Sequence, residues 1–147
     1  MFGCGFATPA ADGYRTVPQF IDRCEADRTT NRMVDAAHGN ERTCLQALLW
    51  NEDDGMLRYL LCLDLPAGGV PGHYELATVP ERTWAVFPLA VEHPGQDHII
   101  DVWKRVWKEW FPESGYEQDT GPRQERSRWG GDGKMIVEAW VPVTRVD

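Results

Sequence analysis

The sequence predicts an α+β fold of duplicated βαββ units with pseudo-twofold symmetry, in which an antiparallel sheet carries two helices on one face. Two stretches with helical spacing of apolar residues each follow one short apolar strand and precede two more. A run rich in glycine and proline, residues 66–72, divides the chain near its midpoint. The 147 residues fit one domain, 1–147, with pseudo-repeats at about 1–66 and 73–147. The other face, or a cleft between the halves, is then free to form a concave site.

The first half contains one predicted helix among three strands. Val17, Phe20 and Cys24 recur at helical spacing, and the helix continues weakly before it ends near His38. The segment from Asn51 to Gly55 has the composition of a hairpin turn. The expected elements are a strand at residues 2–7, a helix at about 17–34, and strands at 44–50 and 57–65.

The second half contains the clearest helix of the sequence. Ile99, Trp103 and Trp107 lie on one apolar stripe, and charged residues fill the opposite face. Pro112 is expected to end this helix, because a proline disfavours the helical conformation of the residue before it. The expected elements are strands at residues 73–79 and 82–90, a loop at 92–97, a helix at 97–111, and strands at 123–129 and 134–143 that the loop 130–133 joins.

Charge and composition exclude several classes of protein. The net charge of −8 disfavours nucleic-acid binding, which requires a basic face. No apolar run approaches the ~18 residues that a membrane span needs, and the N-terminus lacks a signal peptide pattern. We therefore expect a cytoplasmic protein that binds neither nucleic acid directly nor a membrane. The four cysteines lack zinc-ligand spacing, so we expect reduced thiols, no metal and no cofactor.

Two carboxylates interrupt the last two predicted strands. If these strands pair through the loop 130–133, Glu125 faces Glu138. Two adjacent carboxylates repel, so the pKa of one should rise unless a cation arrives. With Trp129 and Trp140 beside them, the pair suits a cationic aromatic ligand. The alternative is that both glutamates lie on the solvent face, paired with Arg126, Arg128 or Lys134.

The seven tryptophans are open to two interpretations, because tryptophan lines pockets but also fills large cores. Trp103 and Trp107 are expected to pack beneath the sheet. Trp84 lies on a strand whose two faces the sequence does not distinguish. The sequence contains no nucleophile-elbow, Walker or H-E-x-x-H motif, so we assign no catalytic residue.

Four segments in the second half, VPERTWAVF, DVWKRVWKEWFPESGYE, RQERSRW and VEAWVPV, resemble the effector-binding domain of AraC-type regulators and the gyrase-inhibitor-like (GyrI-like) small-molecule-binding superfamily. The resemblance covers about residues 72–144 and implies two βαββ units with a ligand cleft between them. It implies that Glu125 lies at the base of the pocket, that Glu138 is a second acidic position, and that Trp84 replaces a pocket tyrosine. Family regulators carry a DNA-binding module before this domain, and we expect a stand-alone member without one.

The leading hypothesis is a stand-alone sensor or sequestering protein that binds a cationic or amphipathic aromatic small molecule. A homodimer is also plausible, because such sheets have exposed edges. The resemblance implies two alternatives: a hydrolase of electrophilic, cyclopropane-bearing compounds that uses a pocket glutamate, and a protein inhibitor of a larger enzyme such as a topoisomerase. The candidate ligand-binding residues are Glu125, Glu138, Trp84, Trp107, Trp110, Trp129 and Tyr59.

Overall fold

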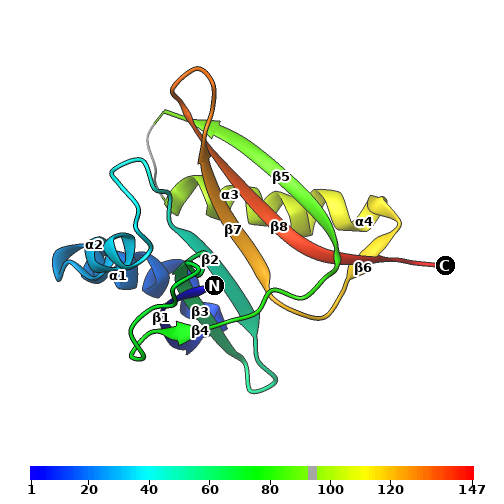
Figure 1. The fold of residues 1–147 in the computed structure, drawn as a ribbon. Helices are drawn as coiled ribbons and strands as arrows, with labels where there is room; N and C mark the ends of the chain where they lie inside the picture. The colour runs from blue at the N-terminus through cyan, green and yellow to red at the C-terminus, as the bar shows by residue number, and fades with distance from the viewer. Residues whose placement is uncertain (93–95) are drawn as a thin grey trace. The chain divides into compact units, whose positions relative to one another are not determined.

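The computed structural model describes residues 1–92 and 96–147 (Figure 1). The fold is mixed α+β with antiparallel strands, as the sequence predicts. The chain divides into two compact units, Met1–Val79 and Pro80–Asp147. We call them unit 1 and unit 2 and describe each by itself.

Unit 1 is a four-stranded antiparallel sheet with helices packed against it. Within it the strand order is β4-β1-β3-β2. Val17, Phe20 and Cys24 of the first helix face Tyr59 and its neighbours in the sheet, which is the core that the sequence spacing predicts. The elements are β1 (Phe2–Pro9), a 3-10 turn (Ala10–Asp12), α1 (Gly13–Ala26), α2 (Thr29–Ala36), β2 (Gln46–Asn51), β3 (Met56–Leu63) and β4 (Glu75–Leu76).

The single helix predicted at residues 17–34 is wrong, because the chain forms two helices with a break between them. Arg28 adopts a left-handed conformation with φ of 66°, which an α-helix does not allow. The Asp27 carboxylate accepts hydrogen bonds from the Thr29 backbone N–H (3.0 Å) and hydroxyl (2.6 Å). Aspartate side chains compete in this way with the helical backbone, and here one starts a new helix.

Unit 2 repeats the arrangement with longer strands. Its strand order is β7-β8-β5, and β6 also pairs with β8. β6, a three-residue strand, was not predicted. The predicted loop 92–97 falls partly on residues 93–95, which lie outside the described residues. The elements are β5 (Thr83–Val91), α3 (Gln96–Arg105), a π-helix (Val106–Trp110), α4 (Phe111–Ser114), β6 (Tyr116–Gln118), β7 (Arg123–Trp129) and β8 (Met135–Arg145).

The helix of unit 2 does not end at Pro112, contrary to the prediction. The preceding residues, Val106–Trp110, form a π-helix, and α4 continues through the proline to Ser114. A proline in an ordinary α-helix loses its hydrogen bond and clashes with the carbonyl four residues earlier. The wider π turn changes this spacing, and Pro112 then takes a position in the first turn of α4, where proline is tolerated.

The predicted register of the last hairpin is wrong by one residue. Glu125 lies opposite Ala139, and Glu138 lies opposite Arg126. The connection contains five residues, 130–134, rather than four, and the Gly130 N–H donates to the Lys134 carbonyl (2.7 Å) to close it. A shift of one residue moves a side chain to the other face of a sheet. Glu125 and Glu138 therefore lie on opposite faces and do not form the predicted pair.

The two units share one topology. In each, the third strand of the βαββ sequence lies between the first and the second. In unit 2, α3 packs on the face of β8 that carries Ala139, Val141 and Val143, all buried. The pseudo-twofold relation and a cleft between the halves stay predictions. Among the described residues no helix is both long and apolar enough to cross a bilayer.

Candidate functional site

Three aromatic rings stack along one side of the helical segment in unit 2. Trp103, Trp107 and Phe111 are four residues apart, which places them on one helical stripe. The ring centroids are 6.2 Å apart for Trp103 and Trp107 and 4.9 Å apart for Trp107 and Phe111, with interplanar angles of 17° and 7°. Trp103 is buried, but Trp107 has 39% of its surface exposed. The stack therefore offers a flat aromatic surface.

Glu125 and Arg123 of β7 face this stack. Both lie on one face of the strand, because side chains alternate between faces. The Trp103 indole N–H donates a 2.7 Å hydrogen bond to the Glu125 carboxylate. The Arg123 guanidinium lies 5.2 Å from the Trp103 ring centroid and 5.9 Å from that of Trp107. We call Trp103, Trp107, Arg123 and Glu125 the carboxylate site.

The apolar surroundings perturb both charged groups of the carboxylate site. Burial raises the pKa of Glu125, and the Trp103 hydrogen bond and the Arg123 charge counteract this only partly. Burial also lowers the pKa of Arg123, against the opposing charge of Glu125. The existing partners therefore do not compensate fully for removing the carboxylate from water. An additional cation beside Glu125 would be attracted for that reason.

Glu138 and Trp84 belong to a second cluster, on the face of the unit 2 sheet opposite α3. The Trp140 indole N–H donates to Glu138 over 3.3 Å, and the Arg128 guanidinium lies 3.6 Å from the other carboxylate oxygen. The Glu138 side chain is 14% exposed. Trp84 packs against Trp140 with ring centroids 6.0 Å apart. Glu138 thus pairs with Arg128, as expected if the glutamates lie on the solvent face of the sheet. Its side chain is nevertheless mostly buried.

The other three predicted residues each have surroundings of their own. Trp110 packs against Phe87 of β5, with centroids 5.1 Å apart. Trp129 is exposed at the end of β7. Tyr59 lies in the core of unit 1, against Phe6 and Phe20, and is 1% exposed.

Of the predicted ligand-binding residues, Glu125 and Trp107 thus share the carboxylate site, and Glu138 and Trp84 share the second cluster. Sequence reasoning missed Trp103 and Arg123 as parts of the site. Both had a signal: Trp103 precedes Trp107 by four residues on a helix, and Arg123 precedes Glu125 by two on a strand.

Tyr59→Ala should destabilise the protein by about 3–5 kcal/mol, the usual cost of removing a buried aromatic ring. The reason is the cavity left between Phe6 and Phe20 of unit 1. Urea unfolding followed by circular dichroism measures the change. A loss below ~1 kcal/mol would contradict the core role of Tyr59.

The described residues hold no group of three or more histidine, cysteine, aspartate or glutamate side chains suited to a metal. Within the part of the chain that the structure describes, the four cysteines are thiols rather than disulfides. Burial raises the pKa of the Cys24 thiol to about 11, so this thiol stays protonated at neutral pH.

An aromatic surface beside a partly buried carboxylate is typical of domains that bind small molecules. The family described as GyrI-like small molecule binding domain matches residues 8–144, so the chain belongs to this family.

Two solved structures are similar in fold. One is a proposed bacterial transcription regulation protein from Staphylococcus aureus MU50, with 18% identity and a TM-score of 0.71 over 97% of this chain and 90% of that chain. The other is SAV2435 bound to tetraphenylphosphonium, with 18% identity and a TM-score of 0.75 over 97% of this chain and 87% of that chain. A comparison with curated proteins finds no match.

Proposed function

We propose that this chain binds a cationic aromatic small molecule at the carboxylate site, as a sensor or sequestering protein. The observation that carries the proposal is the Glu125 carboxylate, held by the Trp103 indole beside the exposed ring of Trp107. Glu125 would neutralise the charge of the ligand, and Trp107 would stack on its aromatic part. Cation–π contacts contribute ~2 kcal/mol or more where the site is desolvated.

Three further observations support a cationic ligand. The Arg123 guanidinium already lies over the faces of Trp103 and Trp107, so these rings accept a cation. SAV2435, which is similar in fold, was solved with the lipophilic cation tetraphenylphosphonium. The net charge of −8 also favours the approach of cations.

Titration with tetraphenylphosphonium tests this proposal. Glu125→Gln should weaken binding at least tenfold, which corresponds to ~1.4 kcal/mol, because a neutral amide cannot compensate the charge of the ligand. The matched control is Glu138→Gln, which makes the same change at a mostly buried glutamate on the other face of the sheet. The control should bind like the wild-type protein. Isothermal titration calorimetry measures both affinities.

Two results would contradict the proposal. If neither variant changes the affinity, Glu125 does not contact the cation. If only Glu138→Gln weakens binding, the ligand site is the cluster around Trp84 and Trp140 instead.

The raised pKa of Glu125 favours the hydrolase as a second candidate function. A carboxylate in an apolar site can act as a general base near neutral pH. Glu125 would take a proton from a water molecule as the water oxygen bonds to the electrophilic carbon of a cyclopropane ring. The ring C–C bond at that carbon would break, and its electron pair would take up a proton on the neighbouring carbon, from the protonated Glu125 or from solvent. Mass spectrometry of such a compound after incubation distinguishes the two functions, because catalysis produces a ring-opened product that increases with time and exceeds the protein concentration. The protein-inhibitor alternative and the homodimer stay predictions.

A further inference from the structure

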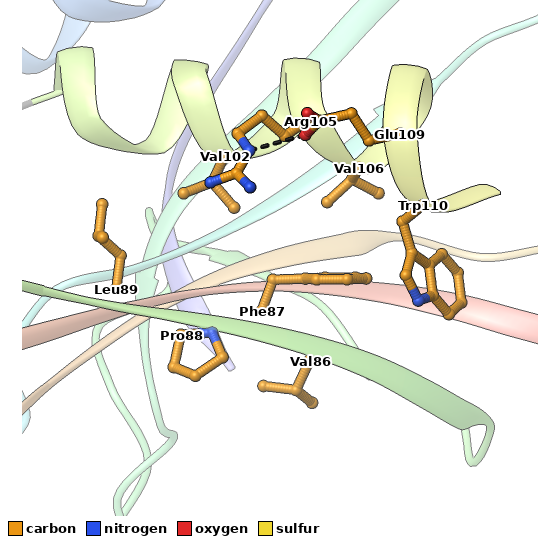
Figure 2. A pocket seen from close by; sticks show the side chains of 9 residues that line it. All are labelled: Val86, Phe87, Pro88, Leu89, Val102, Arg105, Val106, Glu109 and Trp110. Atoms are coloured by element: carbon orange, nitrogen blue, oxygen red, sulfur yellow. Dashed lines mark hydrogen bonds and ion pairs between the residues drawn. The ribbon is translucent and has the colours of Figure 1, made fainter. Parts of the chain in front are cut away.

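A cavity of about 410 Å³ lies between β5 and the helical segment of unit 2, on the side that carries Trp110 (Figure 2). Phe87 and Leu89 point from β5 toward the helix, where Val102 and Val106 face them (Figure 2). The full lining is Val86, Phe87, Pro88, Leu89, Val102, Arg105, Val106, Glu109 and Trp110. Cavities of this size hold drug-sized molecules. We call it the β5 pocket.

The walls of the β5 pocket are apolar, and its two charged groups neutralise each other. Arg105 donates a 2.7 Å hydrogen bond to Glu109, four residues later on the same helix. Both side chains are largely exposed, so they form the rim, while Val106 is buried deep in the pocket. Because the rim carries no net charge, the pocket attracts neither a cation nor an anion strongly. Its chemistry suits a neutral apolar molecule.

Part of the lining of the β5 pocket lies on the π-helix, which is a local irregularity of the backbone. Val106, Glu109 and Trp110 all belong to this five-residue π-helix. Such turns cost stability relative to an α-helix and occur frequently at functional sites. Here the π-helix presents Trp110 to the β5 pocket, and Trp107 to the carboxylate site.

The outer edge of β5, beside the pocket, is poorly suited to pairing with another strand. Among the strands that the structure describes, β5 pairs only with β8, so its outer edge is open to addition. Pro88 lies in the middle of this edge and has no N–H to donate. Proline on an edge strand prevents pairing with another strand, so the edge is poorly suited to a second copy of the chain.

We infer that the β5 pocket is a second binding site in this protein, for a neutral, flat, apolar molecule. The ligand lies between Phe87 and Val102, contacts the ring of Trp110, and leaves any polar end at the Arg105–Glu109 rim. This site differs from the carboxylate site in its residues and in the charge of its ligand. The inference therefore does not depend on the proposed function.

Titration with N-phenyl-1-naphthylamine, a neutral probe that becomes fluorescent in apolar surroundings, tests this inference. Leu89→Glu places a charge in the pocket, and Val102→Phe fills it, so each should weaken probe binding at least tenfold. The matched control is Leu65→Glu, since Leu65 is 48% exposed and Leu89 is 37% exposed. The control should keep the wild-type affinity. Circular dichroism confirms that each variant folds, and the affinity for tetraphenylphosphonium should not change in any of them.

Several results would overturn the inference. The wild-type protein could fail to bind the probe with saturation, or Leu89→Glu and Val102→Phe could leave the affinity unchanged. A loss of probe binding in Glu125→Gln that matches the loss in Leu89→Glu would place the probe in the carboxylate site. Self-association in sedimentation velocity that Leu89→Glu abolishes would show that a second copy covers the pocket.

Discussion

Trp103→Phe is expected to destabilise the protein by about 1.5–3 kcal/mol at neutral pH, the usual contribution of a hydrogen bond to a charged group. Phenylalanine keeps an aromatic ring in the core but has no N–H to donate to Glu125. The same hydrogen bond lowers the pKa of Glu125, so its loss should raise that pKa further. The pH at which cation binding is half lost should therefore shift upward. Chemical unfolding and calorimetric titration over a pH series measure the two effects.

Trp107→Phe provides the matched control for this prediction. It makes the same change of ring four residues further along the stripe, at a side chain that is far more exposed than Trp103. We expect little change in stability and in the midpoint of the pH profile, but a weaker affinity at every pH, because the smaller ring stacks less well. Equal effects of the two substitutions on the pH midpoint would contradict a specific role for the Trp103 indole.

The sequence predicts the individual elements of unit 2 well but not their exact pairing. The limits of β7, Arg123–Trp129, agree with the prediction. The register of the hairpin does not, because it depends on whether Lys134 closes the loop or begins β8. Gly133 adopts a φ of 81° within this loop, a conformation that the composition permits but does not impose. Because the loop is one residue longer than predicted, Glu125 faces the helix and Glu138 lies on the other face of the sheet.

The same limit applies to the carboxylate site. The alternation along β7 indicates that Arg123 and Glu125 share a face, and the helical period indicates that Trp103 and Trp107 share a stripe. The contact between these two pairs is a tertiary one, about twenty residues apart in the chain, and no local pattern predicts it. The π-helix was likewise not predictable, because its residues also fit an amphipathic α-helix.

Stability and cation affinity are expected to respond in opposite directions to pH. Burial raises the pKa of Glu125 in the folded protein above its ordinary value of 4.5. Between these two pKa values the folded protein binds more protons at this group than the unfolded chain does, so stability falls as pH rises. Cation binding requires the carboxylate, so affinity rises over the same range of pH. Thermal unfolding and tetraphenylphosphonium titration across a pH series measure the two curves.

Glu125→Gln should remove the contribution of Glu125 to both pH dependences, because glutamine resembles the protonated carboxyl at every pH. Above the raised pKa the variant should be more stable than the wild-type protein, and this difference should shrink toward pH 4. Glu138→Gln is again the control and should keep the wild-type curves. A variant less stable than wild type at neutral pH would mean that pairing with Arg123 outweighs the burial of the charge. The expected gain would instead show that the charge of the partly buried Glu125 lowers the stability of the folded protein.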